Sequence, residues 1–209
     1  MPTLWIALLT LAIAALGYGL GRKRAMASAG GDIRNLHSRP NYYGMNVALF
    51  AFVPAILLLL VWIVAQPKIL QSSVSHLISQ DQIEATGSLD LVMSDVQRVA
   101  DGLDVAVSEG AMDAATASSL RTDLSDVRAR LGQVGVALGS DVSSETLRAA
   151  QAYRAKSATG NMFKTIFVLG LAIAGMAFAL LRTNATFRAR NTVEHAVMAL
   201  LIAAASIAI

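Results

Sequence analysis

The sequence contains no cysteine among its 209 residues. This absence excludes a disulfide framework, cysteine-ligated zinc, iron–sulfur clusters and thiol catalysis. Charged residues are also scarce, at 15% of the chain, against about a quarter in an ordinary soluble domain. Hydrophobic residues make up 55% of the chain and are concentrated in blocks. The composition therefore predicts membrane spans rather than one large soluble core.

The apolar blocks fall into four segments. Residues 4–20, 47–65 and 163–181 have the length of a transmembrane helix. Residues 196–209 would extend only about 21 Å at about 1.5 Å per residue, short of a hydrocarbon core of about 30 Å. We therefore expect an all-α polytopic membrane protein with three full transmembrane helices and a truncated fourth. We also expect this sequence to be a fragment of a polypeptide that continues past Ile209.

Basic residues predict the orientation of the spans. The two short loops carry an excess of positive charge: Arg22, Lys23, Arg24, Arg34 and Arg39 against Asp32 in the first, and Arg182, Arg188 and Arg190 against Glu194 in the second. The positive-inside rule places both loops in the cytoplasm, so the N-terminus and residues 66–161 are expected outside. Because the basic cluster follows the first apolar segment rather than preceding it, we expect an uncleaved helix and not a signal peptide.

These assignments predict three regions. Residues 1–65 form two membrane helices joined by a basic cytoplasmic loop at 22–46. Residues 66–161 form an exported helical domain. Residues 162–209 contain the third transmembrane helix, a short basic loop and the start of a fourth helix.

The exported region has two stretches of helical periodicity. Apolar residues recur at spacings of three and four along each: Leu89, Val92, Val96, Val99, Leu103 and Val107 in one, and Leu120, Leu124, Val127, Leu131, Val134 and Leu138 in the other. Gly110 predicts a break between them, and Asp113 a following N-cap. Mutual packing of short antiparallel helices explains the pattern, and a groove that docks a partner helix is the alternative.

Two further helices are expected at the edges of the exported region. One begins near Ser143 or Ser144, with Glu145 in its first turn, and runs through Leu147, Ala150 and Tyr153 toward the third span. A shorter one continues from the second span through Val74, Leu77 and Ile78.

Three features of the membrane segments carry further expectations. Lys164 lies at the outer edge of the third span, where its amine is expected to reach the headgroups, and an ion or proton site is the alternative. Pro54 is predicted to bend the second span. The glycines of G-x-G-x-G at 17–21 are best explained by packing against another membrane helix.

Catalytic and metal-binding patterns were not found in the sequence. His37, His76 and His195 lie in different segments and form no metal-binding motif. No Walker phosphate loop or G-x-S-x-G elbow occurs, and no carboxylate pair suggests acid–base catalysis. We therefore predict no enzyme, no cofactor and no nucleic-acid partner, and assign no catalytic, cofactor-binding, metal or substrate-binding residue.

The most distinctive stretch is residues 36–44, which read L-H-S-R-P-N-Y-Y-G and lead into the second span. Pro40 should stop any helix coming from the loop, and Tyr42 and Tyr43 are expected in an interfacial aromatic belt. This R-P-N-Y-Y-G entry resembles the N-terminal region of the PstC-type permease subunit of bacterial phosphate ABC transporters. The outward N-terminus, the helical insert of about a hundred residues and the R-A-R-N-T-V-E-H run at 188–195 are similar to the same region.

The resemblance implies a multi-pass protein of the bacterial inner membrane. Its implied partners are the lipid bilayer, a second permease subunit, an ATPase dimer that hydrolyses ATP, and a periplasmic phosphate-binding protein. In such subunits the transport path and an E-A-A-x-x-x-G coupling loop belong to the permease core, and the loop pattern does not occur in these residues. The path is therefore expected beyond residue 209.

Two other functions are also compatible with the sequence. A membrane receptor or sensor input module also has two spans that flank an exported helical bundle, but it should continue into a cytoplasmic signalling helix after residue 181. A small membrane scaffold complete at Ile209 is the other possibility.

Overall fold

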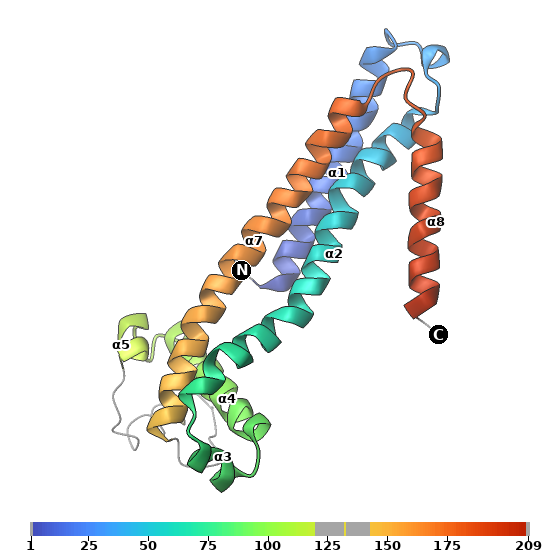
Figure 1. Cartoon of the computed structure of the whole chain (residues 1–209). Coiled ribbons are helices and arrows are strands. Elements are labelled where there is room, and N and C mark those ends of the chain that lie inside the picture. The colour runs from blue at the N-terminus through green and yellow to red at the C-terminus, as the bar shows by residue number, and fades with distance from the viewer. Residues whose placement is uncertain (1, 120–131, 133–142, 208–209) are drawn as a thin grey trace. The chain divides into compact units, whose positions relative to one another are not determined.

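The structure is a computed structural model that describes residues 2–119, 132 and 143–207. It is helical, and no strand occurs in this part of the chain. The helices are α1 (Thr3–Ser28), α2 (Pro40–Val74), α3 (Gln80–Thr86), α4 (Leu89–Ser108), α5 (Ala114–Ser119), α7 (Ser144–Arg182) and α8 (Ala189–Ile207), with 3-10 turns η1 (Ile33–Asn35) and η2 (Ser75–Leu77) (Figure 1). Within the described residues, α1, α2 and α7 are long and apolar enough to cross a membrane, which confirms the predicted all-α membrane fold.

Contacts divide the chain into two compact units. The first, here called the membrane unit, comprises Met1–Trp62 and Met162–Ile209. The second, here called the helical unit, comprises Ile63–Asn161. Helices α2 and α7 each contribute to both units.

The helices are longer than the apolar segments that predicted them. Helix α1 continues through the basic cluster to Ser28, and α2 begins at Pro40, so the irregular part of the predicted 22–46 loop is residues 29–39. Proline is favourable at the first helical position, where its missing N–H is not needed. Likewise α8 begins at Ala189, inside the predicted second loop. Arginine and lysine are good helix formers, so leaving the apolar segment does not end a helix.

Helix α2 runs without interruption through Pro54. The bend that Pro54 predicts therefore stays a prediction.

Glycines allow close packing in the membrane unit, where α1, α2 and α7 lie side by side (Figure 1). A Cβ at Gly17 would lie 3.0 Å from Val47 Cγ1, and one at Gly21 would lie 2.9 Å from the carbonyl oxygen of Tyr43. Both glycines of α1 therefore face α2, which confirms the packing interpretation for them. A Cβ at Gly19 would meet nothing within 4 Å, so the interpretation is wrong there.

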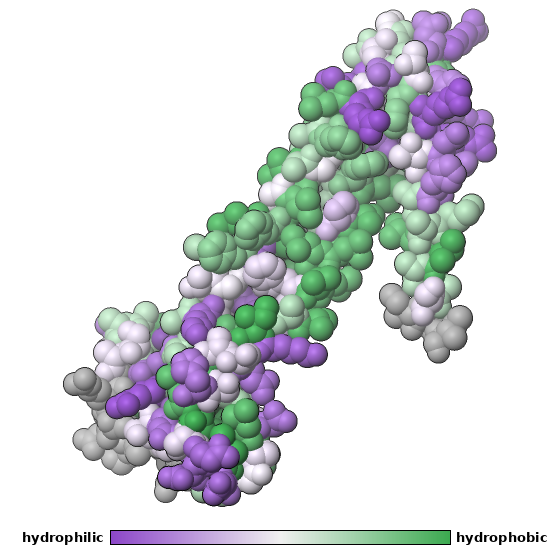
Figure 2. Space-filling view, in the orientation of Figure 1, coloured by the Kyte–Doolittle hydropathy of each residue, from purple (hydrophilic) through white to green (hydrophobic). Residues whose placement is uncertain are grey.

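The outer surface of the membrane unit is apolar. Large hydrophobic side chains such as Leu4 (68% exposed), Leu16 (67%) and Val61 (65%) point away from the packed helices. Figure 2 shows hydrophobic side chains over these helices and hydrophilic ones gathered where the loops lie. This distribution is what a lipid environment requires, because lipid tails solvate apolar side chains.

Helix α4 supplies most of the core of the helical unit. Val92, Val96, Val99 and Leu103 of the predicted seam are buried, and Leu89 and Val107 pack against them. Helix α7 adds Leu147, Ala149 and Ala150 to the same core. The first predicted seam is therefore confirmed, while the second, over residues 120–138, lies outside the described residues apart from Gly132.

The ends of these helices follow local sequence signals. Gly110 has a φ of 74°, a conformation that glycine tolerates, directly after α4. Asp113 Oδ1 accepts a hydrogen bond of 2.7 Å from Thr116 N, so it caps α5 as predicted. Ser143 Oγ accepts one of 3.0 Å from Thr146 N at the start of α7. Helix α7 then continues through the third span to Arg182.

The expected helical continuation of the second span through Val74, Leu77 and Ile78 is confirmed as far as Leu77. The α-helix ends at Val74, a 3-10 turn follows over Ser75–Leu77, and Ile78 is extended. A separate helix, α3, begins at Gln80, where Ser79 Oγ accepts a hydrogen bond from Gln82 N. An N-cap serine thus starts a new helix just after the extended Ile78.

Candidate functional site

The R-P-N-Y-Y-G segment forms a junction at the loop end of the membrane unit. Tyr43, in the first turn of α2, is fully buried. Its hydroxyl lies 3.0 Å from the carbonyl oxygen of Phe187 and 3.2 Å from that of Ala185. Its ring lies 6.4 Å from the Phe187 ring, centroid to centroid. One side chain thereby connects α2 to the chain between α7 and α8.

The expected interfacial belt is wrong for Tyr43, whose ring faces protein and not lipid. Tyr42 is partly buried and packs on the same cluster, which is centred on Ala25, Tyr43 and Ala189. The signal that could have indicated this burial is the adjacent Gly44. A Cβ at Gly44 would lie 2.7 Å from the carbonyl oxygen of Tyr18, so this end of α2 is pressed against α1.

Backbone contacts join the two basic loops. His37 N donates a hydrogen bond of 3.0 Å to the carbonyl oxygen of Ala185, and Arg190 N donates one of 3.3 Å to Ser38 Oγ. Arg190 also pairs with Glu194 on α8, at 2.6 Å. The basic residues of both loops therefore lie at one end of the membrane unit, opposed in sequence only by Asp32 and Glu194.

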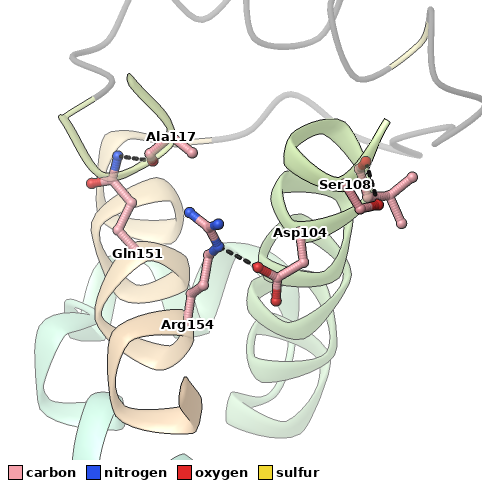
Figure 3. Close-up of polar contacts among 6 residues, drawn as sticks. Asp104, Ser108, Ala117, Gln151 and Arg154 are labelled. Carbon is pink, nitrogen blue, oxygen red and sulfur yellow. Dashed lines mark hydrogen bonds and ion pairs between the residues drawn. The ribbon is translucent and has the colours of Figure 1, made fainter. Parts of the chain in front are cut away.

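The helical unit has a second polar cluster, between α4 and α7 (Figure 3). Arg154 of α7 forms an ion pair with Asp104 of α4, and Gln151 Nε2 donates a hydrogen bond of 3.2 Å to the carbonyl oxygen of Ala117. These residues border a cavity of about 360 Å³. Its other polar lining residues are Ser118, Ser157 and Asn161. The cavity could hold a small polar molecule, but Asp104 already neutralises its arginine, so it does not select for an anion.

Two acid groups near this cluster have altered pKa values. Partial burial raises the pKa of Asp101, and the nearby Asp104 carboxylate raises it further. Burial, together with the charge of Asp101, also raises the pKa of Tyr153. Each shift disfavours the ionised form of the group concerned.

Comparison with protein families identifies the chain. Residues 7–177 match the model of a family described as phosphate ATP-binding cassette transporter. The chain belongs to this family. No curated protein and no solved structure matched it in the corresponding searches. The matched residues extend from α1 into α7 and include the whole helical unit. The chain is therefore a membrane protein related to phosphate ABC transporters.

The side chain of Lys164 is buried, although its position at the outer edge of the third span predicted that it would reach the lipid headgroups. It is 6% exposed, on the face of α7 that also buries Val168 and Ala172. The expected extension along lipid to the headgroups is therefore wrong. An ionisable side chain inside a span usually faces the protein interior, as Lys164 does.

The other sequence candidates are dispersed or were missed. His37 lies between α1 and α2, His76 lies in η2 and His195 lies in α8. In the part of the chain that the structure describes, no three potential metal ligands come together.

Asn46 is a buried polar residue that the sequence did not indicate. It is 2% exposed, and its Oδ1 has no hydrogen-bond partner among the described residues. Only its position at the entry to a span could have pointed to it.

Glu145 provides a pH-dependent contact in the helical unit. Its Oε2 accepts a hydrogen bond of 2.8 Å from Ser79 N, at the start of α3. This hydrogen bond is the main reason that the pKa of Glu145 lies below its ordinary value of 4.5. A folded-state pKa below the unfolded one contributes stability above the unfolded pKa, and the contribution is lost as pH falls through the folded pKa.

We therefore expect Glu145→Gln to melt at a lower temperature than the parent at pH 7. The difference should shrink toward zero as pH falls well below 4.5, because the parent then loses the same charged acceptor. Thermal unfolding of the purified chain in detergent, followed by circular dichroism from pH 7 to pH 3, measures this. The exposed Glu109, substituted Glu109→Gln, is the control. A Glu145→Gln difference that does not change with pH would contradict the assignment.

Proposed function

We propose that the chain is the N-terminal part of the permease subunit of a phosphate ABC importer in the bacterial inner membrane. The observation that carries the proposal is the family match over residues 7–177. The R-P-N-Y-Y-G entry at 39–44 supports it, because this segment resembles the N-terminal region of PstC-type permease subunits. On this proposal the chain supplies the membrane frame and the helical unit, while the transport path and coupling loop belong to the permease core.

The proposal includes an orientation. The basic junction of residues 22–39 and 182–190 lies in the cytoplasm, and the N-terminus and the helical unit lie in the periplasm. The absence of cysteine makes this testable with single-cysteine variants. Glu109→Cys should react with a membrane-impermeant maleimide in intact spheroplasts, and Ala27→Cys should react only after permeabilisation. The reverse pattern would overturn the orientation.

The proposed partners are a second permease subunit, an ATPase dimer and a periplasmic phosphate-binding protein. The chain itself is then not an enzyme, because ATP hydrolysis takes place on the ATPase. Loss of the gene should abolish high-affinity uptake of radiolabelled phosphate, and the complete tagged gene product should co-purify with the ATPase. Unchanged uptake in the deletion strain, or purification without any ATPase, would contradict the proposal.

A further inference from the structure

A hollow at the loop end of the membrane unit is not used by the function proposed above. Its volume is about 560 Å³. It is lined by Gly19, Arg22, Lys23 and Met26 of α1, Ile33 of η1 and Pro40 at the start of α2. The four α1 residues are spaced by three, one and three positions, so they share one face of the helix. The hollow is therefore bounded by a helix face on one side and by the 29–40 segment on the other.

Contacts on two sides hold Arg22 in place. The guanidinium carbon lies 5.8 Å from the centroid of the Tyr18 ring, within the range of a cation–π interaction. The stem of the side chain lies against α2, since a Cβ at Gly44 would be 2.9 Å from Arg22 Cγ. A positioned cation loses less conformational entropy on binding a ligand than a freely moving one.

Gly19 has a different role from its two neighbours in the G-x-G-x-G run. Gly17 and Gly21 face α2 closely, whereas a Cβ at Gly19 would meet nothing within 4 Å. A larger side chain at 19 would thus enter the hollow rather than push helices apart. The absence of a side chain at Gly19 leaves this space open.

The lining combines two cationic groups with apolar surface. Ile33 of η1 is a large hydrophobic residue that is 57% exposed, and Met26 is half-buried and lines the same hollow. The hollow lies just past the apolar segment 4–20, at the level where lipid headgroups are expected, and the surrounding junction is strongly basic. Inorganic phosphate would satisfy the cations but would leave Met26 and Ile33 uncovered.

We propose that this hollow binds the headgroup of an anionic phospholipid. The phosphodiester lies between Arg22 and Lys23, and the glycerol and upper acyl chain cover Met26 and Ile33. Basic pockets between membrane helices are a recognised means of binding anionic lipids. The proposal requires only that the chain lies in a membrane, so it can fail or succeed independently of the transport role.

Native mass spectrometry of the full chain tests the proposal by comparing retained phosphatidylglycerol with phosphatidylcholine of the same acyl chains. Two kinds of variant separate charge from shape. Arg22→Gln/Lys23→Gln removes the two cations of the hollow, and Arg34→Gln/Arg188→Gln removes two cations of the same junction outside it. Gly19→Leu fills the hollow without changing charge. Gly170→Leu is its control, because a Cβ at Gly170 also meets nothing within 4 Å.

We expect phosphatidylglycerol to be retained in preference to phosphatidylcholine. The preference should fall by about thirtyfold in Arg22→Gln/Lys23→Gln, since two basic residues near a membrane surface together contribute about 2 kcal/mol and every 1.4 kcal/mol is tenfold. Gly19→Leu should reduce it as well, and both control variants should keep it. Equal losses in the two charge variants would show diffuse attraction and overturn the proposal. Displacement of the lipid by millimolar inorganic phosphate would overturn it too, by identifying a phosphate site. If Arg22→Gln/Lys23→Gln fails to fold, Gly19→Leu still tests the proposal, and Arg22→Gln/Lys23→Gln does so if Gly19→Leu fails to fold.

Discussion

Gly175→Ala should destabilise the membrane unit by about 3 kcal/mol, at the upper end of the range for overpacking. A Cβ at this position of α7 would overlap the carbonyl oxygen of Phe50 on α2, and it would lie 2.9 Å from the carbonyl carbon. It would also lie 3.4 Å from the Cα of Ala51. All three atoms belong to the backbone of a transmembrane helix, so no side chain can rotate to make room. The helices must move apart.

The Phe50 carbonyl is a special neighbour because of Pro54. Proline has no N–H, so Pro54 cannot donate the helical hydrogen bond that the carbonyl four residues earlier would receive. One Cα hydrogen of Gly175 occupies the direction in which a Cβ would be built, and it therefore points at this oxygen. Cα–H···O contacts of this kind recur between packed helices. Separation of the helices would remove the contact as well as the surrounding packing.

Thermal unfolding of the purified variant in detergent measures the effect. Gly170→Ala is the matched control on the same helix, because a Cβ there meets nothing within 4 Å. The control should be neutral or slightly stabilising, since alanine has a higher helix propensity than glycine by about 1 kcal/mol. Equal melting temperatures for Gly175→Ala and Gly170→Ala would show that α2 and α7 do not pack as described.

The sequence predicts the spans well because they are continuous apolar runs, and it predicts the α4 seam well because its apolar residues recur at helical spacing. Residues 47–65 and 163–181 lie within α2 and α7, and Val92, Val96, Val99 and Leu103 are buried as their spacing predicts. Both the spans and the α4 seam can be predicted from neighbouring residues alone. The apolar surface of a helix decides which side chains are buried, whether in lipid or in a small helical core.

The junction at Tyr43 and the burial of Lys164 could not be predicted in the same way. An aromatic residue at the start of a span normally marks the lipid interface, and a lysine at its edge normally reaches the headgroups. The expectation for Tyr43 failed because a segment remote in sequence covers its side chain, and the expectation for Lys164 failed because its side chain is only 6% exposed. Tyr43 contacts Ala185 and Phe187, more than 140 residues away, and periodicity carries no information on such pairs. Gly19 shows the same limit, since its spacing matches that of Gly17 but its surroundings do not.

Tyr43→Ala should cost about 3–5 kcal/mol of stability, the range for removing a large buried aromatic side chain. The ring is fully buried among residues of α1, α2 and the chain leading into α8, so its loss leaves a cavity in the junction. Tyr43→Phe should cost about 1–3 kcal/mol, because it keeps the ring and removes only the donor to the partly buried carbonyl oxygens of Ala185 and Phe187. Tyr42→Phe, which changes the same atom on the partly buried neighbouring ring, should have a smaller effect than either.

Hydrogen exchange locates the effect of these variants within the unit. The hydroxyl of Tyr43 and the amide of His37 both reach the segment around Ala185, so loosening that segment should also expose the His37 amide. In Tyr43→Phe, exchange of the peptides that cover residues 36–39 and 183–190 should accelerate by about tenfold, the factor that corresponds to about 1.4 kcal/mol of lost local stability. Peptides from α4 should not change. Uniform acceleration over the whole chain would show that Tyr43 contributes only general packing. Faster exchange confined to residues 36–39 and 183–190 instead requires that the hydroxyl of Tyr43 joins these two loops.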